Sequence, residues 1–347
     1  MEGKGTPLSE IGLYSLIERY VPKAEYKHAA TEVGIGDDAA VIRSETGHQL
    51  LTQVLFLEGI HFDRVYTPLR HLGYKVVVSA LADMLAMNGT PRQLVVSVGL
   101  SSRMTLEMVD ELMDGLLWAC EQYKIDFVGF RPSSSLTGLS IAVSLTGWAS
   151  EEKLLLRTKS KPTDILCVSG DLGSAFMGLQ LLEREKRVLK GNGDVKPEFG
   201  NSDYLLERQL KPEAKTWVAE TLNKLEVQPT AMINVKDGLA AALLLLCKAS
   251  GTGCRIHEKK IPLHQITLKV AHEMNFNPLV AALNGGEDYE LLFSLSLSDY
   301  ERVMSRFPEN ISVIGYLTEA GKGCRIITGS DQEIDLKAQG WKDPSQG

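Results

Sequence analysis

The sequence lacks Cys-x-x-Cys pairs, clusters of basic residues and long apolar runs. Its five cysteines are odd in number and widely spaced, which argues for reduced thiols in the cytoplasm and against a disulfide framework or a zinc site. The formal net charge of −7 comes from 37 basic and 44 acidic residues, and this balance argues against nucleic acid or an anionic membrane as a partner. The longest apolar run, residues 239–247, is too short to cross a bilayer.

The familiar glycine motifs of nucleotide-binding proteins are also absent. Residues 165–185 have the pattern of a strand, a glycine turn and a helix, an arrangement that can bind a phosphate at the helix N-terminus. This segment contains neither Gly-x-Gly-x-x-Gly nor Gly-Lys-Ser/Thr, so an ordinary structural connection is the preferred interpretation.

The chain is large enough for two hydrophobic cores. Its 347 residues are 44% hydrophobic and 23% charged, as in ordinary globular proteins, and the mixed pattern predicts an α/β (α+β) fold. Charged residues and a proline at 150–162 suggest a boundary between an N-terminal domain, 1–150, and a C-terminal domain, 151–347. Periodicity predicts helices at 8–20, 69–87, 106–123, 175–185, 239–249, 263–274 and 298–307, others ending near 225, and strands at 39–42, 50–57, 94–100, 127–130, 139–148, 165–168, 254–256, 289–293, 311–316 and 324–327.

Two adjacent carboxylates, Asp37 and Asp38, follow a glycine turn and precede an apolar strand. Glycines allow close approach to a ligand, and paired carboxylates often hold a cation, although a solvated Gly/Asp turn is the common alternative. A hairpin of residues 39–42 and 50–57 would bring residues 52–54 beside this turn. The nearly continuous apolar run from Leu50 to Leu57 predicts a strand that is buried on both faces.

Other acidic residues lie in apolar surroundings. Asp83 is beside the apolar stripe of the helix at 69–87, so it must be neutral, be paired with a donor or basic group, or bind a metal. Asp237 precedes Gly238 and an Ala/Leu-rich helix, where it is placed as an N-cap. A third acidic segment, residues 285–290, precedes a predicted strand.

Six segments in order, GIGDDAAV, EGIHFD, LADMLAMNGTP, KDGL, LNGGEDYELLF and AQGW, resemble the thiamine-monophosphate kinase family. The resemblance implies the two-domain fold that this family shares with aminoimidazole ribonucleotide synthetase, and a homodimer built through N-terminal strands. It also implies ATP, several Mg²⁺ ions, and transfer of the γ-phosphoryl group to thiamine monophosphate. Because both reacting phosphates are anionic, carboxylate-held metals would make physical sense of the acids.

The resemblance assigns candidate site residues position by position. Its metal-binding pattern matches Asp38, Thr52, Asp83 and Asp237. Its nucleotide-binding positions match Gly129 and Arg157, and its thiamine-phosphate contacts match His61, Glu287 and Trp341.

The departures from the family pattern lie at the same positions. Acidic or polar family residues are replaced here by Gln53, Val54, Arg131, Asn234 and Lys236, a family glycine by Phe130, and a later acid by Ala242. Arg131 and Lys236 are expected either to act as fixed cations in the former nucleotide site or to turn to solvent or pair with Asp37, Asp38 or Asp83.

Three functions therefore remain open. The first is an ATP-dependent thiamine-monophosphate kinase. The second is a non-catalytic member that binds thiamine phosphate or another phosphate ligand, or acts as a partner subunit, since loss of metal carboxylates should slow phosphoryl transfer. The third, a paralogue of the purine-synthesis enzyme, is disfavoured by the EGIHF and AQGW segments.

Overall fold

The computed structural model describes residues 31–33, 37–44, 47–191 and 199–339. Within these residues the chain forms two mixed sheets, and each sheet takes its strands from one half of the sequence. The first helix predicted from the sequence, residues 8–20, lies outside the described residues. The predicted division at residue 150 falls between the two sheets and remains a prediction.

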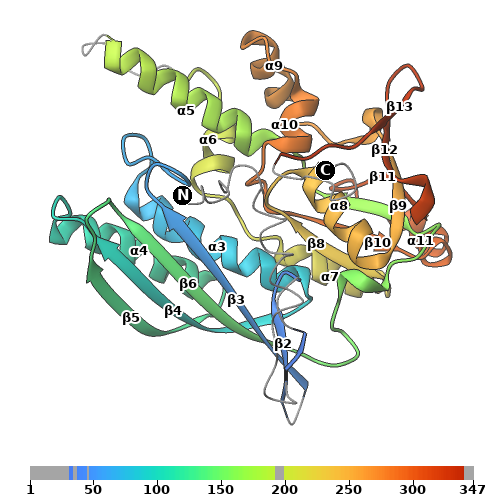
Figure 1. The fold of residues 1–347 in the computed structure, drawn as a ribbon, viewed down its shortest axis with the longest axis horizontal. Coiled ribbons are helices and arrows are strands. Elements are labelled where there is room, and N and C mark those ends of the chain that lie inside the picture. The colour runs from blue at the N-terminus through green and yellow to red at the C-terminus, as the bar shows by residue number, and fades with distance from the viewer. Residues whose placement is uncertain (1–30, 34–36, 45–46, 192–198, 340–347) are drawn as a thin grey trace, which may run out of the picture.

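The first sheet has the strand order β1-β2-β3-β6-β4-β5, with β4 and β5 parallel and the other pairs antiparallel. Two long helices, α3 and α4, cover one of its faces (Figure 1). The elements are β1 (Thr31–Val33), β2 (Ala40–Ser44), β3 (Gly47–Leu57), α3 (Leu69–Ala86), β4 (Thr90–Leu100), α4 (Leu106–Gln122), β5 (Asp126–Ser134) and β6 (Ser140–Ala149).

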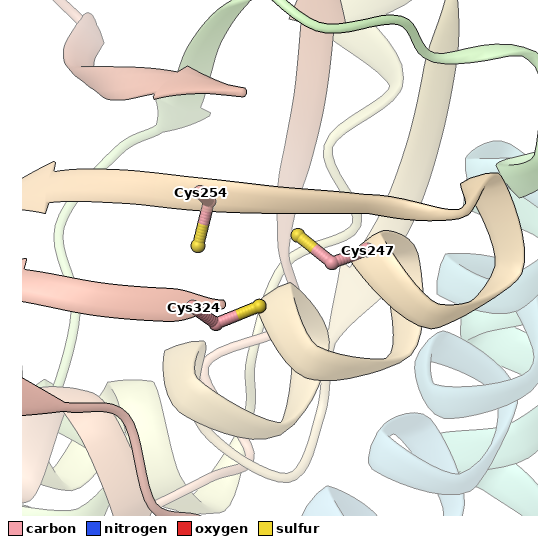
Figure 2. Close-up of side chains that lie close together, drawn as sticks. All are labelled: Cys247, Cys254 and Cys324. Carbon is pink, nitrogen blue, oxygen red and sulfur yellow. The ribbon is translucent and has the colours of Figure 1, made fainter. Parts of the chain in front are cut away.

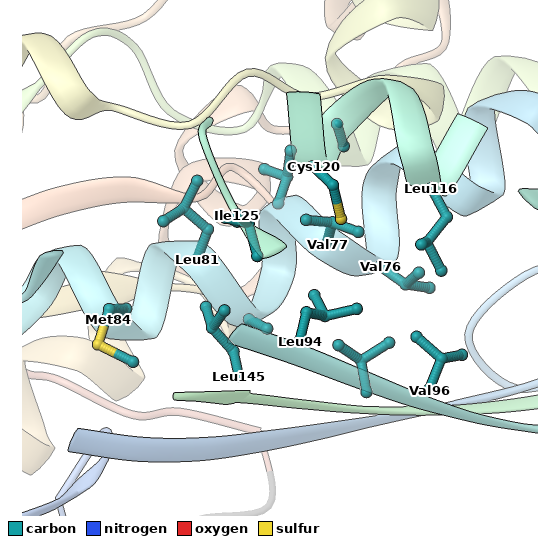
Figure 3. Close-up of a cluster of buried hydrophobic side chains, with 14 of the residues drawn as sticks. Val76, Val77, Leu81, Met84, Leu94, Val96, Leu116, Cys120, Ile125 and Leu145 are labelled. Atoms are coloured by element: carbon teal, nitrogen blue, oxygen red, sulfur yellow. The ribbon is translucent and has the colours of Figure 1, made fainter. Parts of the chain in front are cut away.

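The first core lies between this sheet and its two helices. Figure 3 shows side chains of α3 and α4 packed onto Leu94, Val96 and Leu145. The two helices approach closely because of Gly73 and Gly115, where an added Cβ would lie 2.0 and 1.8 Å from a carbonyl oxygen of the other helix. A larger residue at either position would force the helices apart.

The structure corrects one expectation about β3. Its residues alternate between buried and exposed along most of the strand, so the apolar run is buried on one face only within the chain. Leu51 and Leu55 on the other face are 40% and 51% exposed. A continuous apolar run could not distinguish a strand between two layers from one with an open apolar face.

The second sheet has the order β13-β12-β9-β11-β7-β10-β8, with only β9 and β12 parallel among its described pairs. Its core is formed with α8 and neighbouring helices. The elements are β7 (Ile165–Ser169), α5 (Ser174–Gly191), α6 (Asp203–Leu210), α7 (Thr216–Lys224), β8 (Ala231–Val235), α8 (Leu239–Ser250), β9 (Thr252–His257), α9 (Gln265–Glu273), α10 (Pro278–Asn284), β10 (Glu290–Leu295), α11 (Leu297–Val303), β11 (Ile311–Glu319), β12 (Cys324–Ile327) and β13 (Glu333–Asp335).

Most predicted elements are present, and the misses are short. The β2–β3 hairpin is confirmed, whereas β1, β8, α10 and β13 were not predicted. The predicted N-cap at Asp237 is wrong, because α8 begins at Leu239 and its N-cap is Gly238, which has φ 90°. Among the described residues, no helix is both long and apolar enough to cross a membrane.

Candidate functional site

A polar stripe on α3 joins the two halves of the chain. Lys75, Ser79 and Asp83 are each four residues apart, so they share one face of a helix that is largely apolar and buried. Lys75 pairs with Glu287 at 2.9 Å, and Ser79 hydrogen-bonds Tyr289. Each contact joins the first half of the sequence to the second half, and the site lies at this junction.

Asp83 is buried and fully engaged. Its two carboxylate oxygens each lie 3.2 Å from Lys236 Nζ, and one also accepts a hydrogen bond from Asn234 at 2.9 Å. Thr52 Oγ1 donates to Asp83 at 3.5 Å and to the Asp38 carbonyl at 3.3 Å. Asn234 and Lys236, two of the departures from the family pattern, thus satisfy this carboxylate directly.

The charge of Asp83 acts on Lys236 in turn. The carboxylate raises the pKa of Lys236, so the ammonium is firmly protonated. The Lys236 side chain is still 40% exposed, whereas that of Asp83 is 3% exposed. The lysine therefore has a path to solvent, and the carboxylate has none.

The Asp37-Asp38 pair is held by Arg157, a buried residue that precedes the second sheet. The guanidinium pairs with Asp38 and lies 3.1 Å from Asp37. Burial raises the pKa of Asp38 to about 6, although Arg157 acts in the opposite direction. The hairpin prediction placed Thr52 beside this turn, and the Thr52 contact with Asp38 confirms that placement.

The oxygen donors of this centre are of the type that binds Mg²⁺, but the carboxylates among them are already paired with cationic side chains. Asp38, Asp83 and Thr52 offer the oxygen ligands that Mg²⁺ prefers. Both carboxylates are nevertheless neutralised by Arg157 and Lys236, and a divalent ion between them would face these two cations. As arranged, the site does not fit a resident Mg²⁺. Of the two expectations for Lys236, the structure shows the second, in which the lysine pairs with an acid, Asp83.

Asp237 does not join this centre as a ligand. Its side chain is exposed in the loop between β8 and α8, although its charge contributes to the raised pKa of Lys236. Of the metal positions implied by resemblance, Asp38, Thr52 and Asp83 are therefore linked by direct contacts and Asp237 is peripheral.

The nucleotide positions are separated in the single chain. Gly129, Phe130 and Arg131 are on β5, which is three strands from β3 in the sheet, or about 14 Å at ordinary strand spacing. Arg131 is exposed rather than turned towards Asp38. The structure therefore does not bring these residues to Arg157 within one chain.

The other substituted positions lie on β3. Gln53 is on the open face of the sheet and donates a hydrogen bond to Ser144 at 3.0 Å. The half-buried Val54 lies on the opposite face, which packs against the helices. Thus only Val54 of this pair shares a face with Thr52.

Among the thiamine-phosphate positions, His61 and Glu287 are described and Trp341 lies outside the described residues. His61 Nδ1 accepts a hydrogen bond from the Leu57 amide at 3.1 Å in the loop after β3, roughly 17 Å along the strand from Thr52. A hollow of about 840 Å³ lies beside this loop, lined in part by Glu58 and Arg64. Glu287 accepts from Gln209 and Lys75, both at 2.9 Å.

A second ionic centre, which was not predicted, surrounds Arg208. Asp288, adjacent to Glu287, accepts hydrogen bonds from the backbone amides of Gly173 and Ala175 at the start of α5. Glu290 pairs with Arg208 at 2.8 Å and with Lys215 at 2.9 Å. The signal in the sequence was that these acids directly precede the apolar run of β10 (Glu290–Leu295), whose first residue is buried.

Lys75 was also missed. Its signal was the four-residue spacing to Ser79 and Asp83, which places a basic group on the same helix face as the predicted buried acid.

Comparisons with known proteins cover most of the chain. Residues 36–149 match the family model "AIR synthase related protein, N-terminal domain". The thiamine-monophosphate kinase of Aquifex aeolicus (strain VF5) is 31% identical over 288 residues, 83% of this chain and 87% of the relative. That of Bacillus subtilis (strain 168) is 29% identical over 332 residues, 94% of this chain and 98% of the relative.

The solved structure of AaThiL complexed with AMPPCP and TMP superposes with a TM-score of 0.82 at 29% identity, and covers 96% of this chain and 98% of that one. The family is shown by the Aquifex aeolicus relative, which exceeds 30% identity over most of its length. The chain belongs to the thiamine-monophosphate kinase family.

Proposed function

We propose that this protein transfers the γ-phosphoryl group of ATP to thiamine monophosphate and so forms thiamine diphosphate and ADP. The observation that carries the proposal is the match along 96% of the chain to AaThiL, whose solved complex contains AMPPCP and TMP. The relatives named above are thiamine-monophosphate kinases. They support the catalytic hypothesis, and nothing in them supports the non-catalytic alternative.

The reaction requires two anionic groups to meet in line. An oxygen of the thiamine phosphate forms a bond to the γ-phosphorus, the bond to the β-phosphate oxygen breaks, and ADP leaves. Positioned cations lower the repulsion between the two phosphates. Arg157 and Lys236 are the candidates beside the carboxylates, and Lys236 has the exposed path that a mobile contact to phosphate needs.

Magnesium enters the proposal with the nucleotide. Mg²⁺ is commonly held by substrate phosphates, one or two carboxylates and water. ATP would therefore arrive as its magnesium complex, while Asp38, Thr52 and Asp83 organise the cationic side chains around it. The substrate side of the proposed site consists of His61, Glu287 and Trp341, with the indole as a surface for the cationic heterocycle.

We also propose a homodimer in the cytoplasm. The open face of the first sheet carries Leu51 and Leu55 on β3 and Val95 on β4, which are 40%, 51% and 39% exposed. An apolar sheet face of this kind favours packing against a second copy. Gly129 and Arg131 belong to the same sheet, so this packing would bring nucleotide positions of one copy to the other. The free cysteines support a reducing compartment.

Light scattering at micromolar concentration tests the dimer. The wild type is expected to have twice the chain mass, and Leu55→Glu is expected to shift it towards the monomer. Leu117→Glu is the matched control, because this leucine is 45% exposed but lies on α4, which covers the opposite face of the sheet. A monomeric wild type, or a Leu55→Glu protein that remains a dimer, would contradict this proposal.

The function itself is tested by a steady-state assay with ATP, Mg²⁺ and thiamine monophosphate, in which thiamine diphosphate is quantified by chromatography. We expect product to form in equal amount to ADP, and none without thiamine monophosphate. Calorimetry with thiamine monophosphate alone separates binding from turnover. Binding without product would favour a non-catalytic protein and overturn the kinase proposal.

A further inference from the structure

Three cysteines that are far apart in the sequence meet in the second half of the fold. Cys247 lies near the end of α8, Cys254 on β9 and Cys324 at the start of β12. Their sulfur atoms all lie within 4.8 Å of one another. Figure 2 shows the three side chains turned towards a common space between the helix and the two strands.

The backbone holds these positions in place. Cys254 and Cys324 are directly paired in the parallel ladder of β9 and β12. The Cys254 amide also donates to the Gly323 carbonyl at 3.1 Å. The buried Arg255 side chain donates to the carbonyls of Gly323 and Lys322, each at 3.1 Å, and so fixes the turn that precedes Cys324. The three sulfur atoms are therefore brought together by secondary structure and not by a flexible loop.

We propose that Cys247, Cys254 and Cys324 form a three-sulfur binding site for a soft monovalent metal ion, copper(I). Thiolate is the ligand class that selects copper(I). At a metal–sulfur distance of about 2.3 Å, a trigonal site places sulfur atoms roughly 4 Å apart. The observed separations need to close by less than about 1 Å to reach that geometry.

The number of ligands favours copper(I) over zinc. Structural zinc sites are almost always tetrahedral with four protein ligands. Within the part of the chain that the structure describes, no histidine, cysteine, aspartate or glutamate completes this group as a fourth ligand. Three thiolates can satisfy a trigonal soft ion without another donor.

The cluster has one accessible side. Cys324 is half-buried, whereas Cys247 and Cys254 are buried, so an ion can enter past Cys324. The thiol protons that binding displaces are released to water.

This site is separate from the proposed kinase site. The helix between Lys236 and Cys247 spans about 12 Å from Leu239 to Cys247. Metal binding at the cysteines can therefore be measured without any reference to phosphoryl transfer, and its failure would leave the proposed function untouched.

The test is a copper(I) titration of the full reduced chain in oxygen-free buffer, against a coloured copper(I) chelator of known affinity. We expect one equivalent per chain, with an affinity that rises with pH because binding displaces thiol protons. Cys324→Ser should weaken binding at least about 100-fold. Cys120→Ala is the control, because this buried cysteine lies in the first core, away from the cluster.

Three results would overturn the proposal. One is equal copper(I) affinity in the wild type and Cys324→Ser. Another is a higher affinity of the site for Zn²⁺ than for copper(I), which would assign the site to zinc. The third is a wild type that retains no copper and in which mild oxidation forms a disulfide between two of these cysteines. That result would make the cluster a redox pair. A thermal melt of each variant establishes that it is folded.

Arg255→Lys loses the planar fork of donors that fixes the turn before Cys324. This variant should give an intermediate loss of copper(I) affinity.

Discussion

The protein has two buried ionic centres that differ in how their charges are held. Around Asp83, the carboxylate is paired with a lysine whose side chain is 40% exposed, and the partners come from both halves of the chain. Around Arg208, the guanidinium side chain is 9% exposed and its partner Glu290 is 1% exposed. Asp288 there also caps the backbone at the start of α5. The cation of the first centre is accessible to solvent, and that of the second is not.

We propose that this difference separates a binding site from a structural one. A buried ion pair contributes little net stability when compared with apolar packing, but removal of one partner is strongly destabilising. A centre whose cation reaches solvent can accept a phosphate without such a loss. The acids of the GGEDYE segment lie in different surroundings, since Glu287 pairs with the buried Lys75 at the junction and Glu290 lies within the second sheet.

The largest effect on stability is expected from Arg208→Met. This change removes the partner of Glu290 and the cation beside Asp288, so the free energy of unfolding should fall by about 3–5 kcal/mol. Urea unfolding monitored by circular dichroism measures it. The exposed pair of Arg302 and Asp299 provides the control, because Arg302→Met should change stability by less than about 1 kcal/mol. Equal effects of the two variants would contradict the structural role of the buried Arg208.

The largest effect on activity is expected from Asp83→Asn. The amide keeps the shape of the side chain but loses the charge that positions Lys236, so kcat should fall by about 100- to 1000-fold. The melting temperature should change far less than in Arg208→Met. Asp126→Asn, at an exposed position, is the control. Full activity in Asp83→Asn would show that the paired centre is not the kinase site.

A smaller, pH-dependent effect is expected from Asp288→Asn. Burial raises the pKa of Asp288 from its ordinary value of 3.8 to about 7, so the native state binds this proton more tightly than the unfolded state does. Stability from this group is present below about pH 4 and is lost as the pH rises through 7. The unfolding free energy of the wild type minus that of the variant should therefore decrease between pH 5 and pH 8. A difference that is constant with pH, or that increases, would contradict the assignment.

The elements and the acidic centre were largely predictable, because they depend on local patterns. The stripe of α3 predicted that Asp83 needs a partner, and the hairpin predicted that Thr52 lies beside Asp38. The identity of that partner was not decided, because Lys236 could equally turn to solvent or pair with an acid. The position of β5 at the far edge of the sheet depends on the strand order, which separates Gly129 from Arg157. The cysteine cluster depends on the parallel pairing of β9 and β12, and no spacing in the sequence indicates that pairing.

The claim that Lys236, paired with Asp83, supplies the positive charge at this site is tested most directly by the Mg²⁺ dependence of phosphoryl transfer. This dependence is measured in the wild type and in Lys236→Ser. The magnesium complex of ATP is kept at a saturating concentration while the concentration of free Mg²⁺ is varied. The variant frees a buried carboxylate that can then take a metal ligand role, so its activity should rise with free Mg²⁺ over a range in which the wild type is already constant. Identical Mg²⁺ dependence and identical kcat in the two proteins would contradict the claim that Lys236 supplies the positive charge at this site.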